Sequence, residues 1–250
     1  MKRTFLMPLI LLTLGCSSQN EEQPSTNEAS TFEGTKQGGA GEENYGQSTL
    51  YALVEANAED FSKAAANKDI GFSMGKDDAR KVNGVINLKI SGKWKPLEVF
   101  RDTLLNTNHP KTREYRYLGR NKDINKYLVA GTSYKDYQTY LVDIDTGEIM
   151  ATTWTEPIVS PDKRYLANVS LPTAMEPSPN GIQVWKVAEQ GRTKTIEQYI
   201  EIEQQEWEPF EMYWESSRFI IIKMIPMKKY ALLQGEPKQD DFSYLRLTIK

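Results

Sequence analysis

Along most of the chain, apolar and polar residues alternate with a period of two, which is typical of β-strands with one buried face. The run GVINLKISGKWKPLEVF, from residue 84 to 100, has two such stretches on either side of Ser91-Gly92, a pair suited to a tight turn. This run therefore predicts a β-hairpin. Its apolar residues are Val85, Ile86, Leu88, Ile90, Trp94, Leu97, Val99 and Phe100.

Further strand-like runs follow, and turn signals such as Ser160-Pro161-Asp162 and Asn180-Gly181 separate nearly all of them. They are KTREYRYLGR, KYLVAGTSY, QTYLVDID, YLANVSL, GIQVWKV, TIEQYIEIE, RFIIIKMI and SYLRLTIK. Short strands at this spacing predict a mainly β domain over residues 82–250, built as an antiparallel meander or as a sandwich.

Residues 47–81 predict a helical lead-in to that domain. In STLYALVEANAEDFSKAAA, residues 48–66, apolar positions recur at spacings of three and four, as on one face of a helix. Ser48 or Thr49 is the expected N-cap.

A weak internal repeat indicates which β architecture to expect. INKYLVAGTSYKDYQTYLVDIDTGEI, from residue 124, aligns with DKRYLANVSLPTAMEPSPNGIQVWKVAEQG, from residue 162, and a poorer copy begins at SSRFIIIKMIPMKKYALL. The stretch VSPDKRYLANVS and the later NGIQVWKV resemble one blade of WD40-type and TolB-type propellers. The resemblance implies a propeller-like meander. Since residues 82–250 leave room for about four blades of ~40 residues, we expect an open or few-bladed arrangement, with a sandwich as the alternative.

The N-terminus predicts an export signal. Thr4 to Leu14 is an apolar run after Lys2 and Arg3, and it is too short to span a bilayer, which needs about 20 residues. Leu12-Thr13-Leu14-Gly15-Cys16 resembles the lipobox of bacterial lipoproteins, although Thr13 stands where leucine is common. The resemblance implies that residues 1–15 are removed and that Cys16 carries the lipid. The alternative is an ordinary signal peptide with an incidental cysteine.

The segment after the cysteine predicts how the folded domain is attached to a membrane and which membrane that is. Residues 16–46 are rich in Gln, Glu, Ser, Thr, Asn and Gly, so we expect a flexible acidic tether between a lipid anchor and the folded domain. Cys16 is the sole cysteine, so a lipidated chain has no thiol for a disulfide or a nucleophile. In the lipoprotein family Ser17, in place of aspartate, implies the outer membrane of the cell envelope.

Charge narrows the range of partners. The formal net charge is −3, and removal of Lys2 and Arg3 with the signal makes the mature chain more acidic. Nucleic-acid binding requires a basic face, so no nucleic-acid partner is expected. An acidic chain is also not expected to hold an anionic membrane by charge alone.

No motif predicts catalysis, a cofactor or a metal. His109, the one histidine, lies in the loop-like NTNHPKT, and no serine elbow or His-Glu-x-x-His motif accompanies it. Asp143, Asp145 and Glu148 in DIDTGE lack the remaining ligands of a calcium loop, and a hairpin turn in which Asp145 bonds its own backbone is the simpler interpretation. Two carboxylates in a cleft would suffice for a hydrolase, and the many acidic residues leave that possibility open.

The stretch EIEQQEWEPFEMYWES, residues 201–216, predicts a candidate binding surface. It concentrates aromatic side chains and negative charge in what reads as a loop, and protein interfaces use aromatics with a polar rim. The candidate residues are Trp207, Phe210, Tyr213, Trp214, Glu206, Glu208 and Glu211. The alternative is that Trp207, Phe210 and Trp214 anchor the core. A proline-rich loop at 170–181 is a second candidate for recognition.

We therefore expect a lipid-anchored envelope protein that acts as a non-enzymatic protein-binding module, either an assembly accessory or an inhibitor or immunity-type protein. One alternative is recognition of a glycan or peptidoglycan fragment through exposed Trp207 and Trp214. A carboxylate-based hydrolase is the other alternative.

Overall fold

The computed structural model describes residues 44–67, 71–75, 77–104, 109, 111–133, 136–170, 179–191 and 193–250. The chain separates into two units, Met1–Glu33 and Gly34–Lys250, and every described residue belongs to the second. No helix within the described ranges has the length and apolar character needed to cross a bilayer.

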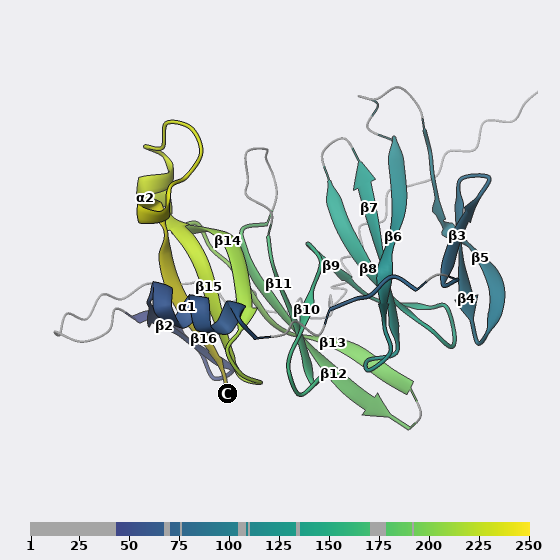
Figure 1. Cartoon of the computed structure of the whole chain (residues 1–250), viewed down its shortest axis with the longest axis horizontal. Helices are drawn as coiled ribbons and strands as arrows, with labels where there is room; N and C mark the ends of the chain where they lie inside the picture. The colour runs from purple at the N-terminus through teal and green to yellow at the C-terminus, as the bar shows by residue number, and fades with distance from the viewer. Residues whose placement is uncertain are drawn as a thin grey trace, which may run out of the picture. The chain divides into compact units, whose positions relative to one another are not determined.

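The described residues form four antiparallel sheets (Figure 1). The first has three strands, in the order β3 (Ala79–Val82), β4 (Val85–Ile90) and β5 (Lys93–Arg101). The second has four strands, in the order β6 (Arg113–Asn121), β7 (Lys126–Ser133), β8 (Tyr137–Asp143) and β9 (Ile149–Thr153). The third also has four strands, in the order β10 (Ile158–Val159), β11 (Tyr165–Val169), β12 (Gly181–Gln190) and β13 (Thr193–Glu203).

The fourth sheet joins the two ends of the folded unit. Its order is β1 (Asn44–Gln47), β2 (Tyr51–Ala56), β16 (Ser243–Ile249), β15 (Phe219–Pro226) and β14 (Trp207–Trp214). Three short helices complete the structure: α1 (Ala58–Ala65), α2 (Met227–Tyr230) and the 3-10 turn η1 (Gln239–Asp241).

Three apolar clusters pack each sheet onto the next along the chain. One lies between β3–β5 and β6–β9, the second between β6–β9 and β10–β13, and the third between β10–β13 and the five-stranded sheet. None of the three clusters combines described residues of the three-stranded sheet with residues of the five-stranded one. The predicted mainly β class, with successive antiparallel sheets and a short helix near the start, is confirmed, and the sheets formed by the described residues do not close into a barrel.

The predicted hairpin at residues 84–100 is also confirmed. β4 pairs with β5 through Ser91 and Gly92, both of which have positive φ angles of 45° and 78°. A turn with two left-handed residues matches the twist of the flanking strands.

The predicted helix at residues 48–66 is wrong in its first half. Residues 51–56 form strand β2, which lies between β1 and β16, and the helix begins only after Asn57. The Asn57 Oδ1 accepts hydrogen bonds from the amides of Glu59 and Asp60, both at 2.9 Å, so Asn57 and not Ser48 is the N-cap. β2 and β16 are neighbours in space but lie near opposite ends of the folded unit's sequence. Such long-range pairing overrides the local periodicity that predicts a helix.

Candidate functional site

The candidate surface at residues 201–216 includes a buried strand and is not a loop. Residues 207–214 are β14, and the side chains of Trp207 and Trp214 are only 2% and 4% exposed, within the cluster between this sheet and β10–β13. The Trp214 indole N–H donates to the Ile158 carbonyl at 3.0 Å. Trp207 and Trp214 are therefore core anchors, and neither is available as part of a contact surface.

A β-bulge explains why both tryptophans face inward. They are seven residues apart, so a regular strand would place them on opposite faces. The register shifts between Pro209 and Glu211, and the extra residue returns Trp214 to the inner face. Pro209 is tolerated because β14 is an edge strand.

The other five candidate residues lie in different environments. Phe210 and Tyr213 are half-buried, Glu208 is fully buried, and Glu206 and Glu211 are exposed. Phe210 packs edge-on against Phe242, and Glu211 binds Lys223 at 2.9 Å. These residues do not form one continuous exposed face.

Two of the candidate residues, Glu211 and Tyr213, line a pocket of about 240 Å³. Glu211, Met212 and Tyr213 line it together with Thr155, Glu156, Ile158 and Val169. Glu156 accepts the hydroxyl of Tyr137, and Glu211 is held by Lys223, so both carboxylates already have partners. The proline-rich 170–181 loop starts beside Val169, but residues 171–178 of that loop are outside the described residues.

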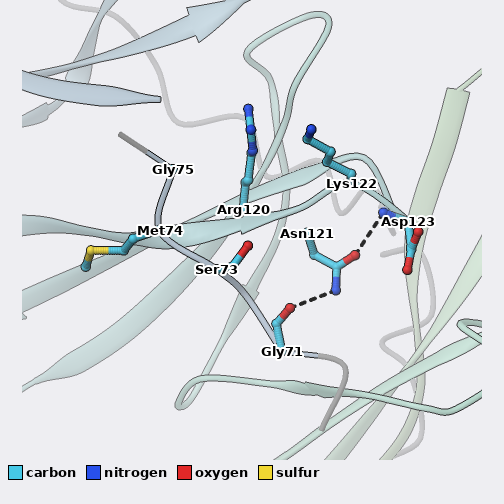
Figure 2. A pocket seen from close by; sticks show the side chains of 8 residues that line it. All are labelled: Gly71, Ser73, Met74, Gly75, Arg120, Asn121, Lys122 and Asp123. Atoms are coloured by element: carbon cyan, nitrogen blue, oxygen red, sulfur yellow. Dashed lines mark hydrogen bonds between the residues drawn. The ribbon is translucent and has the colours of Figure 1, made fainter. Parts of the chain in front are cut away.

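A larger pocket, of about 480 Å³, lies where residues 71–75 meet the end of β6 (Figure 2). Figure 2 shows Arg120 and Lys122 extending to one side while Asn121 turns to the other, where its amide donates to the Gly71 carbonyl at 3.1 Å. Arg120 binds Asp78 at 2.6 Å, and Asp123 binds Lys163 at 2.7 Å.

The charges around this pocket are therefore mostly paired. Burial first, and then the Asp78 carboxylate, raise the pKa of Tyr117, whose hydroxyl donates to Asp78 at 3.3 Å. Within the described part of the chain Lys122 has no ion pair, but one lysine in a pocket does not define a class of ligand.

The DIDTGE turn contributes Asp143 to a buried ion pair that joins two sheets. Asp143 and Lys126 are fully buried and their charged groups are 2.8 Å apart. Lys126 also donates to the Lys194 carbonyl of β13, so the pair joins two sheets. Burial alone would raise the pKa of Asp143, but hydrogen bonds from Lys126 and from the backbone of Thr146 outweigh it and hold this pKa below its usual value.

The turn differs in one detail from the expected geometry. Asp143, and not Asp145, accepts the backbone amides of the turn, from Asp145 and Thr146. Gly147 has a positive φ of 77°, which a glycine adopts without strain in a turn. No group of three or more potential metal-ligating His, Cys, Asp or Glu residues occurs among the residues described.

Two further predicted positions are placed as follows. His109 is half-buried, and its Nδ1 accepts the Lys111 amide at 3.1 Å. Cys16, the predicted lipidation site, lies outside the described residues.

The exposed tryptophan is on another sheet. Of the five tryptophans, Trp94 on β5 has the most accessible side chain, 37% exposed. The β4 register pairs it with Lys89, while Ile86, Leu88 and Ile90 of the same strand point into the cluster against β6–β9. Trp94 therefore lies on the outer face of the three-stranded sheet, away from its core.

We name this surface the Trp94 face and define it by Arg80, Val82, Lys89 and Trp94. The register puts Arg80 and Val82 of β3 on the same side as Lys89 and Trp94. Val82 and Trp94 are 44% and 37% exposed. Tryptophan and arginine are the residue types that most often dominate binding energy, so an exposed tryptophan beside an arginine makes this face a candidate contact surface.

Two cations flank the tryptophan ring. The Arg80 guanidinium carbon lies 4.3 Å from the ring centroid and the Lys89 ammonium 5.9 Å, both within cation–π range. No ion pair joins Arg80 or Lys89 to any carboxylate of the described residues. The neighbouring Lys81 and Arg101 are paired, with Asp102 and Glu98 respectively.

Sequence reasoning placed Trp94 in the hairpin but did not consider it as a binding residue. The signal was present in GKWKP, where a tryptophan stands between two lysines on a strand with period two. The sequence favoured residues 201–216 as the candidate surface because aromatic residues are more frequent there. The frequency of aromatic residues does not distinguish a buried core strand from an exposed surface.

Comparison with known proteins adds no assignment, because no protein-family model, curated protein or solved structure matches this chain. The arrangement of the residues must therefore support any functional conclusion by itself.

Proposed function

We propose that this protein is a lipid-anchored lipoprotein of the bacterial outer membrane and acts as a non-enzymatic protein-binding module. Cys16 is the proposed lipid attachment site. The proposed tether is residues 16–43, since residues 44–46 of the expected tether belong to strand β1. The Trp94 face is the proposed contact surface and replaces the acidic stretch around β14 in that role.

One observation carries the proposal: the Trp94 face exposes tryptophan, valine and arginine side chains on the same side of one sheet. Tryptophan and arginine are the residue types most enriched among those that dominate binding energy. A sheet also holds them in fixed positions, which lowers the entropy lost on association.

The glycan alternative has lost its supporting residues. It required exposed rings at Trp207 and Trp214 for stacking, and both rings are in the core. Trp94 does not replace them directly, because the Arg80 guanidinium already lies over its ring.

Site-specific photo-crosslinking in native cells tests the proposal. The photoreactive residue p-benzoylphenylalanine would replace Trp94 in one variant and Phe219 in a matched control. The two native side chains are equally exposed, at 37%, but Phe219 belongs to the five-stranded sheet. We expect a single envelope protein to be crosslinked from position 94 and not from position 219.

Two results would contradict the proposal. One is that no polypeptide is crosslinked from position 94 although the variant is produced and folded. The other is that positions 94 and 219 give the same set of products, which would indicate random encounters.

A further inference from the structure

We infer that the Trp94 face binds an acidic polypeptide segment of the partner, with its carboxylates on Arg80 and Lys89 and an apolar side chain against Trp94. This inference rests on the proposed function and names the chemistry of the partner.

The first argument is uncompensated charge. The chain as a whole is acidic, with 34 acidic residues against 31 basic ones, yet the strands β3–β5 contain six basic residues, Arg80, Lys81, Lys89, Lys93, Lys95 and Arg101, and the single acid Glu98. Ion pairs with described carboxylates engage only Lys81 and Arg101. Charge of one sign on an otherwise acidic protein favours a partner of the opposite sign.

The second argument is the position of Arg80. Its guanidinium lies over the Trp94 ring, 4.3 Å from ring centroid to Cζ, and this contact restrains the side chain. A guanidinium presents its N–H donors in a planar arrangement that matches the two oxygens of a carboxylate. A restrained guanidinium loses less conformational entropy when it binds a ligand than a mobile one does.

The third argument is the apolar surface beside the cations. Trp94 is more than one-third exposed and the Arg80 guanidinium lies 4.3 Å from its ring centroid, so an anion bound at Arg80 lies next to apolar surface. Free phosphate or a purely anionic polymer would leave that surface in water. A polypeptide that carries both carboxylates and aliphatic side chains covers both.

A polypeptide also fits better than a bilayer. Binding at a membrane interface requires apolar groups to penetrate about 5–10 Å into the headgroup region. The Trp94 ring is only 37% exposed on a flat sheet and is covered by Arg80, so it does not project far enough to insert.

Fluorescence anisotropy with a designed probe tests this inference on the whole purified protein. The probe is a dye-labelled heptapeptide in which aspartate alternates with leucine, and its control has asparagine in place of aspartate. We expect the aspartate probe to bind, more weakly as salt rises, and the asparagine probe to bind at least about tenfold more weakly. The R80Q/K89Q double variant and W94A should each reduce binding of the aspartate probe by about tenfold or more.

The matched control is a K186Q/K228Q variant. Both lysines are exposed and neither forms an ion pair with a described residue, so this variant removes the same charge from other surfaces. Its affinity for the probe should equal that of the wild type. Circular dichroism of each variant establishes that loss of binding is not loss of folding.

Several outcomes would overturn the inference. These are no binding at millimolar probe, equal binding of the two probes, and an equal loss of binding in the control variant. Two others are binding to phosphatidylglycerol vesicles through Arg80 and Lys89 without binding to the probe, and concentration-dependent self-association through the same residues. If the probe fails while crosslinking from position 94 still captures one protein, the inference is wrong and the proposed function stands.

Discussion

The five-stranded sheet and the three-stranded sheet each pack one face on a neighbouring sheet, but their other faces differ. On the five-stranded sheet, α1 lies across β14–β16 (Figure 1), and its Phe61 packs against Tyr213 and Tyr244 at about 5 Å between ring centroids. Arg246 of that sheet binds Asp60 of the helix at 3.2 Å. On the three-stranded sheet the Trp94 face leaves Val82 and Trp94 exposed.

This difference indicates that the aromatic residues of the five-stranded sheet and Trp94 of the three-stranded sheet have different roles. The tryptophans of the five-stranded sheet are buried between two sheets, and the aromatics of its outer face are used to seat a helix of the same chain. Trp94 has cations around it and no such cover. Among the described residues no helix covers the Trp94 face, and this is why the proposed contact surface is placed there.

The largest expected effect tests the covered sheet. Trp214→Ala removes a buried ring and its hydrogen bond to Ile158, and it should lower the free energy of unfolding by about 3–5 kcal/mol. Urea unfolding followed by circular dichroism measures this value. A loss below about 1 kcal/mol would mean that Trp214 is not a core anchor.

The sequence predicted most strands because each is a short run, either alternating as in β6 or continuously apolar as in β7 and β15, with turn signals on either side. It failed where the pattern depends on distant pairing. β2 has the apolar spacing of a helix, and it forms a strand because it pairs with β16, which lies near the other end of the sequence. β14 reads as a loop because the bulge after Pro209 breaks the period-two alternation, and Trp207 and Trp214 share one face only because of that bulge.

The candidate site shows the same limit. Composition identified a dense aromatic stretch, but whether such residues are core or surface depends on what packs against each sheet face. That arrangement involves residues far apart in the sequence, such as Phe61 against Tyr213. A single lysine-flanked tryptophan has a weaker composition signal than residues 201–216, and its exposure is visible only once the register of β4 and β5 is known.

The second prediction concerns the middle sheets, which support both outer ones. Lys126→Met leaves Asp143 buried without its partner, and breaking a buried pair in this way should cost about 3–5 kcal/mol. Because the pair joins β6–β9 to β13, we expect the whole folded unit to unfold in one shifted transition. Tryptophan fluorescence and circular dichroism should report the same midpoint, and two separate transitions would show that the outer sheets are independent.

The same pair predicts a dependence on pH. The pKa of Asp143 is lower in the folded protein than in the unfolded chain, so its contribution is complete above the unfolded pKa, about 4, and is lost as pH falls through the lower folded pKa. Stability should therefore decline below about pH 4. Asp143→Asn should flatten this decline in urea midpoints measured across pH, and an unchanged slope would assign the decline to other carboxylates.

Removing the cover of the five-stranded sheet should have an intermediate effect. Phe61 is half-buried, so Phe61→Ala should cost about 1–2 kcal/mol, less than a fully buried phenylalanine. It should also expose Tyr213 and Tyr244 and increase the binding of a hydrophobic dye. If stability and dye binding do not change, α1 is not needed to cover this face.

The smallest expected effect tests the uncovered sheet. Trp94→Ala removes a ring on the outer face, so the free energy of unfolding should change by no more than about 0.5 kcal/mol. The same variant should lose the part of the tryptophan fluorescence that acrylamide quenches most strongly, because Trp185, Trp207 and Trp214 are each less than one-tenth exposed. A loss of several kcal/mol, or quenching that does not change, would show that Trp94 is covered in solution. The difference between the two outer sheets would then disappear, and with it the argument that only one of them is free to bind.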